Sequence, residues 1–302
     1  MSYRLGINTG FAVNRYPEPE DWSFLVGEIL GLRYLQFTAD LLNPNLPDKI
    51  LDDYIERTNQ ACKYYNVNIS STFTGAFTRV NHLAHPDSRV RNYWVEWFKR
   101  YVDISVALGA VSMGSHFGIF SANDNQDPKK REERREQNIE LWHEIGKYAV
   151  KKGLKFLAWE PMSISREQGE TLAECQRLQE DVNKASPIPF KLCLDVDHGD
   201  LSSSNPDDTD PYVWIKTFGR DSPLIHLKQT IDDKGGHWPF TEEFNKKGKI
   251  IPKKLLFTLE SIKVDNVDLI LELSFREREP FDSQVISVLK ESVAFWREYV
   301  FE

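Results

Sequence analysis

Four short apolar runs in the second half of the chain carry an acid or a histidine at or near their ends. The runs are LAWEP, KLCLDV, LIHLK and LILEL, and the polar residues are Glu160, Asp195, His226 and Glu272. Three carboxylates aimed at one point would repel each other, and at least one would be forced to take up a proton. A divalent cation removes this conflict. Oxygen ligands with one imidazole suit Mn²⁺, which we expect, with Mg²⁺, Co²⁺ or Zn²⁺ also possible.

Each of these residues has a simpler structural explanation when it is taken singly. An acid at a strand end is usually a helix cap or a solvated loop residue, and a histidine among apolar residues is usually a hydrogen-bonded core side chain. The set of four, in this order, is what favours a metal site. We interpret Cys193 as a core residue, and Asp197 and Asp200 as structural or solvated.

Eight apolar runs of strand length alternate with segments of helical periodicity. They lie at residues 4–8, 34–38, 67–73, 110–115, 155–160, 190–196, 223–228 and 268–273. Several are almost continuously apolar, which is typical of parallel strands covered on both faces. The alternation predicts one α/β domain over residues 1–302, a single (β/α)8 TIM barrel. A doubly wound open sheet is the alternative, and it would need no eighth closing strand.

The barrel prediction also places the candidate ligands. Active sites of (β/α)8 barrels lie at the C-terminal ends of the strands. The four candidate ligands end the last four expected strands, which are successive neighbours around a barrel. Residues 231–249 form the longest irregular stretch, and loops of that length are usually functional or disordered. Its aromatic residues favour a packed functional loop, and one of them, Trp238, could shape the pocket.

The composition limits the partners of the protein. The net charge of −8 argues against a nucleic-acid partner, because phosphates repel an acidic surface. No apolar run approaches the roughly 18 residues of a membrane span, and we recognise no signal peptide. Three dispersed cysteines suit a reducing compartment, so we expect a cytoplasmic protein. Exposed aromatic residues such as Trp94, Trp97 and Trp296 would allow a homo-oligomer.

The order of these motifs resembles that of the xylose isomerase-like barrel superfamily. It is more closely similar to the branch of sugar (phosphate) isomerases and epimerases. The matching segments are FLAWEP, LDVDHGD, LIHLKQT, LILELSF and, earlier, HLAHPDSRVR, and the resemblance covers about residues 3 to 300. The segments NTGFAVNRYPEPEDW, FTADLLNPNLP and GGHWPFTEEFNKKG resemble the subgroup of erythrulose 1-phosphate 3-epimerases.

The resemblance implies an activity and a role for each site residue. The cation would be held by the four candidate ligands, and Glu160 and Glu272 would also be the catalytic acid/base pair. His198 would contact a substrate oxygen. A proton beside the ketone would leave one face and return to the other through a metal-stabilised enediolate. Many ketose epimerases carry an arginine shortly after the histidine that matches His226, and this chain does not, so its substrate contacts must differ there.

A phosphorylated ketose would need cationic contacts away from the cation. Lys228, Arg276 and Arg278 follow site strands and are candidates, although the two arginines could equally belong to a charged surface run. Gln229 and His116 are further candidates for substrate binding. We assign the remaining histidines to surface or loop positions: His82, His85, His143 and His237.

Three other functions remain open at the sequence level. An aldose–ketose isomerase would use the same cation and is poorly separated from an epimerase. An abasic-site endonuclease would need a trinuclear site with further histidines, of which His116 could supply only one. A non-catalytic sugar-binding barrel would be marked by the loss of a ligand, and all four are present.

Overall fold

The eight apolar runs form eight parallel strands that close into a barrel. The computed structural model describes residues 2–231, 234–275 and 282–300. The strands are Tyr3–Asn8 (β1), Tyr34–Thr38 (β2), Asn68–Phe73 (β3), Ser112–His116 (β4), Phe156–Glu160 (β5), Phe190–Asp195 (β6), Leu224–Leu227 (β7) and Val267–Leu271 (β10). Their order around the barrel follows the chain, and β1 pairs with both β2 and β10. This closure confirms the (β/α)8 barrel, and the open-sheet alternative is wrong.

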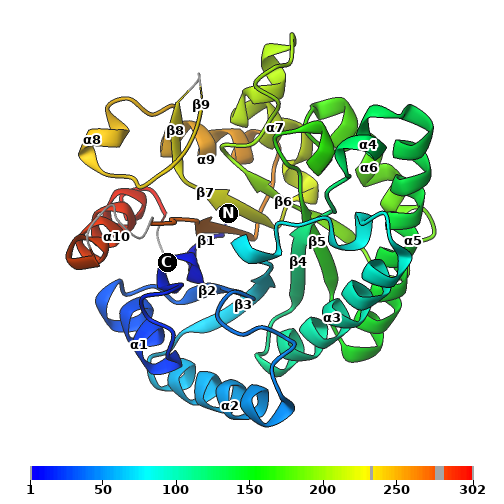
Figure 1. Cartoon of the computed structure of the whole chain (residues 1–302). Helices are drawn as coiled ribbons and strands as arrows, with labels where there is room; N and C mark the ends of the chain where they lie inside the picture. Colours follow the sequence, from blue (N-terminus) through cyan, green and yellow to red (C-terminus); the bar gives the residue numbers. More distant parts are fainter. Residues whose placement is uncertain (1, 232–233, 276–281, 301–302) are drawn as a thin grey trace.

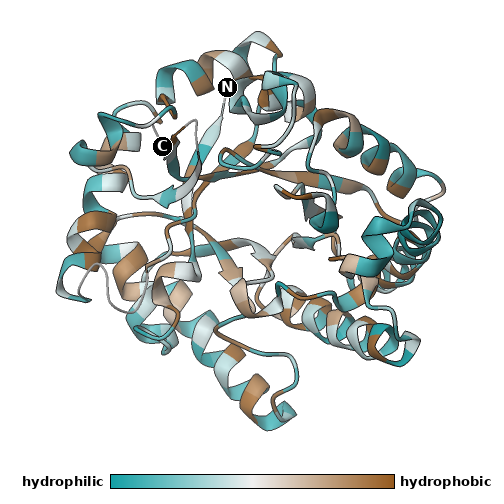
Figure 2. Ribbon diagram, turned by 45° about the horizontal axis from the view of Figure 1, so that its top comes forward, coloured by the Kyte–Doolittle hydropathy of each residue, from teal (hydrophilic) through white to brown (hydrophobic). Residues whose placement is uncertain are grey.

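The strands are apolar because both of their faces are covered. Every residue of β4 and of β10 is buried. A small cluster fills the barrel interior and contains Phe73, Ala158, Cys193 and Leu224, so Cys193 is a core residue as expected. The outward-facing side chains pack beneath the surrounding helices in a much larger cluster. Figure 2 shows apolar residues along the strands and on the helix faces turned toward them.

Helices surround the barrel between successive strands (Figure 1). They are Pro19–Phe24 (α1), Asp48–Tyr64 (α2), Ser88–Ala107 (α3), Ala122–Gln126 (α4), Pro128–Lys152 (α5), Leu172–Asn183 (α6), Pro211–Phe218 (α7), Pro252–Ser261 (α9) and Asp282–Arg297 (α10). Local chemistry sets the ends of α5. Asp127 caps the backbone N–H groups of Lys129 and Lys130, and Gly153 ends the helix in the left-handed region, with φ of 102°.

The aromatic residues that we expected on the surface are largely buried. Trp97 is 2% exposed and Trp296 is fully buried, and Trp94 packs against the same outer core. The expectation of exposed aromatic residues is therefore wrong for Trp97 and Trp296, and Trp94 is only partly exposed. Their helices turn them inward because large aromatic side chains fill the space between helix and barrel.

The predicted loop after β7 contains a short antiparallel hairpin. Its strands are Gln229–Ile231 (β8) and Lys234–Trp238 (β9), and Glu242–Asn245 (α8) follows. Trp238 stacks on Phe244, with ring centroids 4.8 Å apart. The loop is packed, as expected, but part of it is a β-hairpin. The polar composition of this segment did not indicate the two strands.

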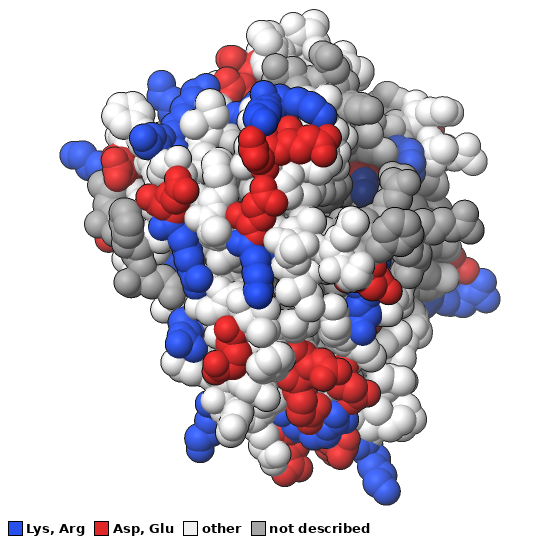
Figure 3. All heavy atoms as spheres, turned by 90° about the vertical axis from the view of Figure 1, so that its left-hand side faces the viewer, with Lys and Arg blue, Asp and Glu red and all other residues white. Residues whose placement is uncertain are grey.

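The surface carries charges of both signs. On the face that Figure 3 presents, lysine and arginine side chains alternate with aspartate and glutamate over the described residues. Within the described part of the chain, no helix combines the length and the apolar character that crossing a bilayer requires.

Candidate metal centre

Four side chains from four adjacent strands converge at the C-terminal end of the barrel. Glu160 and Asp195 are the last residues of β5 and β6, His226 lies in β7, and Glu272 directly follows β10. Each offers one ligand atom, and these atoms all lie within 4.8 Å of one another. We call these four residues the acidic cluster. The structure therefore brings together the four candidate ligands that the sequence singled out.

His226 is oriented by a glutamine on the other side of the barrel interior. The Nε2 of His226 lies 2.7 Å from Oε1 of Gln36, and Nε2 of Gln36 donates to Oγ of Ser71 at 3.3 Å. The glutamine oxygen is thus turned toward the imidazole, and Nε2 of His226 carries the proton. Its Nδ1 lies 3.0 Å from Glu160 Oε1 and 3.5 Å from Glu272 Oε1. This is the tautomer that a metal-binding Nδ1 requires.

A buried lysine reduces the negative charge of the cluster. Lys228 is fully buried, contacts a carboxylate oxygen of Asp195 and donates to Glu272 Oε2 at 2.7 Å. Burial would raise the pKa of Asp195, but the neighbouring His198 and Lys228 side chains hold that pKa well below its usual range. Lys228 thus offsets one of three carboxylate charges. Two charges remain, which matches a divalent cation, so the donor set fits the expected ion.

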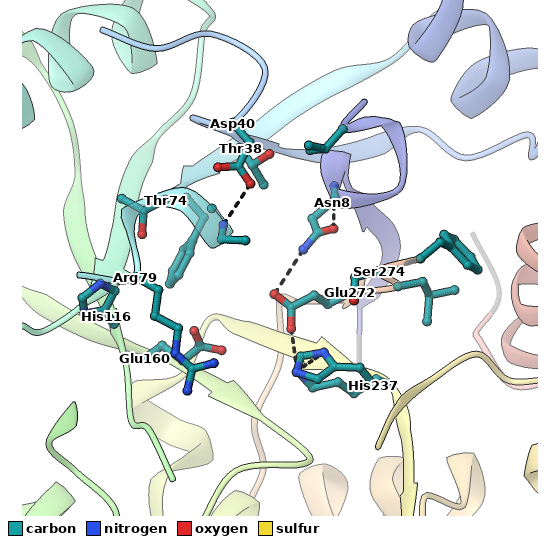
Figure 4. Close-up of a pocket in the computed structure, with 18 of the residues that line it drawn as sticks. Asn8, Thr38, Asp40, Thr74, Arg79, His116, Glu160, His237, Glu272 and Ser274 are labelled. Carbon is teal, nitrogen blue, oxygen red and sulfur yellow. Dashed lines mark hydrogen bonds and ion pairs between the residues drawn. The ribbon is translucent and has the colours of Figure 1, made fainter. Parts of the chain in front are cut away.

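The acidic cluster forms one end of a cavity of about 360 Å³. Glu160, Glu272, Lys228 and His198 line it together with residues from β1 and the loops after β2 and β3. His198 donates from Nδ1 to the carbonyl oxygen of Pro161 at 2.8 Å, and its Nε2 lies 3.5 Å from Asp195. Figure 4 shows Glu160 and Glu272 projecting into this cavity from opposite sides. A small polar ligand that enters it meets both glutamates.

The comparison with protein families agrees with this arrangement. A family model described as the xylose isomerase-like TIM barrel matches residues 28–299. The chain belongs to this family. The resemblance inferred from the strand-end motifs is thereby confirmed, and the matched range includes the whole acidic cluster of this xylose isomerase-like barrel.

Individual relatives narrow the class of enzyme. D-erythrulose 1-phosphate 3-epimerase from Brucella abortus (strain 2308) is 45% identical over 302 residues, which cover 99% of this chain and 97% of that protein. This similarity confirms that the chain is an enzyme of the isomerase class.

Two solved structures share the fold. A candidate xylose isomerase from Rhodospirillum rubrum ATCC 11170 has a TM-score of 0.88 and 27% identity, with 98% of this chain and 99% of that chain covered. D-psicose 3-epimerase from Clostridium cellulolyticum H10, solved with D-tagatose, has a TM-score of 0.71 and 15% identity, with 98% and 99% covered. At 15% identity the second likeness concerns the barrel alone.

Some of the residues predicted to bind substrate in this xylose isomerase-like barrel line the cavity, and others lie elsewhere. His198, His116 and Lys228 line the cavity. Gln229 instead bonds to both backbone groups of Ile250 and to Asn245, and it thereby holds the segment after β9. Trp238 is occupied by its stacking on Phe244 and does not line the cavity. Arg276 and Arg278 lie outside the described residues.

Of the histidines that we assigned to surface or loop positions, His82 is buried and His237 lines the cavity. His237, on β9, lines the cavity, and its Nδ1 lies 3.0 Å from Nζ of Lys228. His82 is 1% exposed, and its Nε2 lies 3.1 Å from Nδ1 of His116. The assignment to the surface is wrong for His82, whereas His237 is exposed on the hairpin and fits the assignment. Each histidine lies in a connecting segment, and only tertiary structure reveals that His82 contacts His116 and that His237 contacts Lys228.

Sequence reasoning also missed polar residues from the first half of the barrel. Asn8 donates to Glu272 Oε1 at 3.3 Å, Gln36 orients His226, and Arg79 and Asp40 line the cavity. A signal for two of them was present. Asn8 ends a strand on the active-site face, and Gln36 is a polar residue inside the apolar run YLQFT, where a buried amide needs a partner.

Proposed function

We propose that this enzyme is a metal-dependent sugar-phosphate 3-epimerase and that its substrate is D-erythrulose 1-phosphate. The observation that carries the reaction type is the position of two glutamates from different strands on either side of one imidazole nitrogen, 3.0 and 3.5 Å from it. The choice of substrate rests on the 45% identical relative from Brucella abortus, which has this activity in its name.

The acidic cluster would hold the cation, and we propose Mn²⁺ as the preferred ion. A bound divalent cation supplies Lewis-acid polarisation of the substrate carbonyl and lowers the energy of charge that develops on its oxygen. His226 would bind through Nδ1, because its Nε2 proton is committed to Gln36. Asp195 is held as a carboxylate by the positive charges around it, so it is available as a ligand.

The two glutamates would exchange the proton at C3. One carboxylate removes it from one face of the sugar, and the other returns a proton to the opposite face of the planar enediolate. Burial would raise the pKa of Glu272, but the positive charge of Lys228 holds it below its usual value, so Glu272 is ionised at neutral pH. Asn8 and Lys228 hold its two oxygens in place. Both glutamates are largely shielded from water, which limits loss of the abstracted proton.

The test is product analysis with D-erythrulose 1-phosphate. The purified enzyme is treated with a chelator, reloaded with Mn²⁺ and incubated with the substrate in D₂O. We expect the C3 epimer, with deuterium at C3, and no reaction before Mn²⁺ is restored. An aldose phosphate as product would identify an aldose–ketose isomerase instead. A fully active chelated enzyme, or an epimer without deuterium, would contradict the proposed mechanism.

We also propose that the enzyme works in the cytoplasm. Cys62, Cys175 and Cys193 are all buried and free, as expected of a protein from a reducing compartment. Fractionation of the source cells with an antibody against the protein would test this. Recovery of the enzyme outside the cytoplasmic fraction would contradict it.

A further inference from the structure

Arg79 extends into the cavity from the loop between β3 and α3. Its side chain is 51% exposed, and it lines the same cavity as the acidic cluster. Figure 4 shows its guanidinium beside Glu160, directed into the pocket. No sequence motif marks this arginine, and the proposed proton transfer does not use it.

One edge of the guanidinium is held by a buried acid. Nε of Arg79 donates to Glu167 Oε1 at 3.0 Å, and Nη2 donates to Oε2 at 2.7 Å. Glu167 is 5% exposed and lies in the loop after β5. Among the residues that the structure describes, Nη1 of Arg79 has no hydrogen-bond partner. The end of the guanidinium therefore retains N–H donors for a ligand with several oxygens.

The backbone that carries Arg79 is fixed at two further points. The carboxylate of Asp40 accepts the N–H groups of Ala76 at 2.9 Å and Phe77 at 3.4 Å. Nε2 of His116 donates to the carbonyl oxygen of Thr78 at 3.0 Å.

The tautomer of His116 follows from its neighbour. Leu83 N–H donates to Nδ1 of His82, so Nε2 of His82 carries a proton and donates to Nδ1 of His116. His116 therefore has its own proton on Nε2. Since both of its ring nitrogens are engaged within the protein, His116 positions the loop rather than the substrate.

Arg79 is the positively charged side chain that a ligand in the cavity can reach. Of the described lysine and arginine side chains that line the cavity, the other is Lys228, which is fully buried between Asp195 and Glu272. A phosphate dianion that enters the cavity would meet carboxylates at the acidic cluster and at Asp40. Favourable charge is concentrated at Arg79. Because the loop already holds this side chain in place, ligand binding costs little of its conformational entropy.

We propose that Arg79 binds the phosphate group of the substrate and thereby selects sugar phosphates over free ketoses. This inference rests on the proposed function for its substrate, and it reassigns the phosphate contact from Lys228 to a residue on the opposite half of the barrel. Glu167 holds the guanidinium in place while its free end contacts the phosphate oxygens.

The experiment compares the wild type with Arg79→Gln, Arg79→Lys and Arg89→Gln. Arg89 is the matched control, because it is also ion-paired but 88% exposed, and it does not line the cavity. We measure kcat and KM for erythrulose 1-phosphate and for free erythrulose. For Arg79→Gln we expect KM for the phosphate ester to rise about 10- to 100-fold, with kcat/KM for the free ketose within about twofold of wild type. Arg79→Lys should recover part of the loss, and Arg89→Gln should match the wild type.

Calorimetric titration with inorganic phosphate separates this proposal from the proposed function. We expect the wild type to bind phosphate and Arg79→Gln to lose that binding, whether or not either protein epimerises a tetrulose. Equal losses on both substrates would show that Arg79 only supports the fold and would overturn the proposal. Unchanged phosphate binding in a folded Arg79→Gln variant would overturn it as well. If Arg79→Gln does not fold, Arg79→Lys tests the proposal through a partial loss of phosphate binding, and unchanged binding in that variant would overturn it.

Discussion

Gln36 and His226 are hydrogen-bonded across the interior of the barrel, although β1 and β10 lie between their strands around its wall. The bond of 2.7 Å joins residues 190 positions apart in the chain. It places the Nδ1 atom of the imidazole among three carboxylates. The half of the barrel without any candidate ligand therefore sets the geometry of the half that has them all.

Replacement of Gln36 by leucine should weaken cation binding. The imidazole would lose the acceptor for its Nε2 proton, and its tautomer and ring orientation would no longer be fixed. We expect the Kd for Mn²⁺ to rise about 10- to 100-fold, measured by isothermal titration calorimetry. Gln60→Leu on α2 is the control, since that exposed glutamine bonds, among the described residues, only to Glu56. Equal affinities in the two variants would contradict the role of Gln36.

The two glutamates should fail in different ways when each is replaced by glutamine. Epimerisation should fall by about 10²- to 10⁴-fold in both variants. Each variant should nevertheless retain one base, so it should exchange the C3 proton of one epimer with D₂O and leave the other epimer unlabelled. NMR of each pure epimer measures this. The preference should be opposite in Glu160→Gln and Glu272→Gln, and the same preference in both would exclude a scheme with one base on each face.

Removal of the cation should destabilise the protein. Without it, the acidic cluster retains the repulsion of three carboxylates that Lys228 only partly offsets. We expect the thermal midpoint to rise with Mn²⁺ concentration, because the ion binds the folded state. The rise should be absent in His226→Gln, which lacks one candidate ligand, and present in His143→Gln, whose histidine lies on α5, bonds to Val182 on α6 and is not part of the acidic cluster. A shift of equal size in His226→Gln would place the cation elsewhere.

Acid should destabilise the fold through the buried pair His82 and His116. Burial lowers the pKa of His116 from 6.5 to about 4, and that of His82 also lies well below its usual value. Between pH 6.5 and 4 the unfolded chain takes up these protons and the folded protein does not, so stability falls as the pH falls. The loss is up to about 3 kcal/mol for His116. Above pH 6.5 this contribution is constant.

Denaturant unfolding of the wild type and His116→Gln checks this expectation. The variant has an amide in place of the titrating ring, so its stability should depend less steeply on pH between 6.5 and 4. Its absolute stability is expected to be lower, since two buried hydrogen bonds change. Parallel pH profiles for the two proteins would show that His116 does not contribute.

The fold was predictable because the strands are buried on both faces. An apolar run such as LILEL or KLCLDV must be buried. Eight such runs that alternate with helical segments are compatible with only a few folds. Boundaries moved by a residue or two where polar residues belong to a strand. His116 is the last residue of β4 although the apolar pattern stops before it.

The acidic cluster was predictable for a related reason. The last residues of parallel strands in a closed barrel all lie at the same end of it. Residues that end successive strands are therefore neighbours in space. Gln36, His237 and Arg79 could not be placed in this way. Their positions depend on contacts across the barrel or on loops that fold over its mouth, and neither leaves a periodic pattern in the sequence.

The burial of Lys228 beside the acidic cluster has a consequence for ion discrimination. Because this ammonium group is always present, the charge of the bound ion should contribute more to selectivity than its radius. A sodium or potassium ion would leave one negative charge unmatched at a largely buried site, and a trivalent ion would introduce an excess of positive charge. Abundant monovalent salts should therefore compete poorly for this position, and the choice among divalent ions passes to coordination preference and to cellular supply.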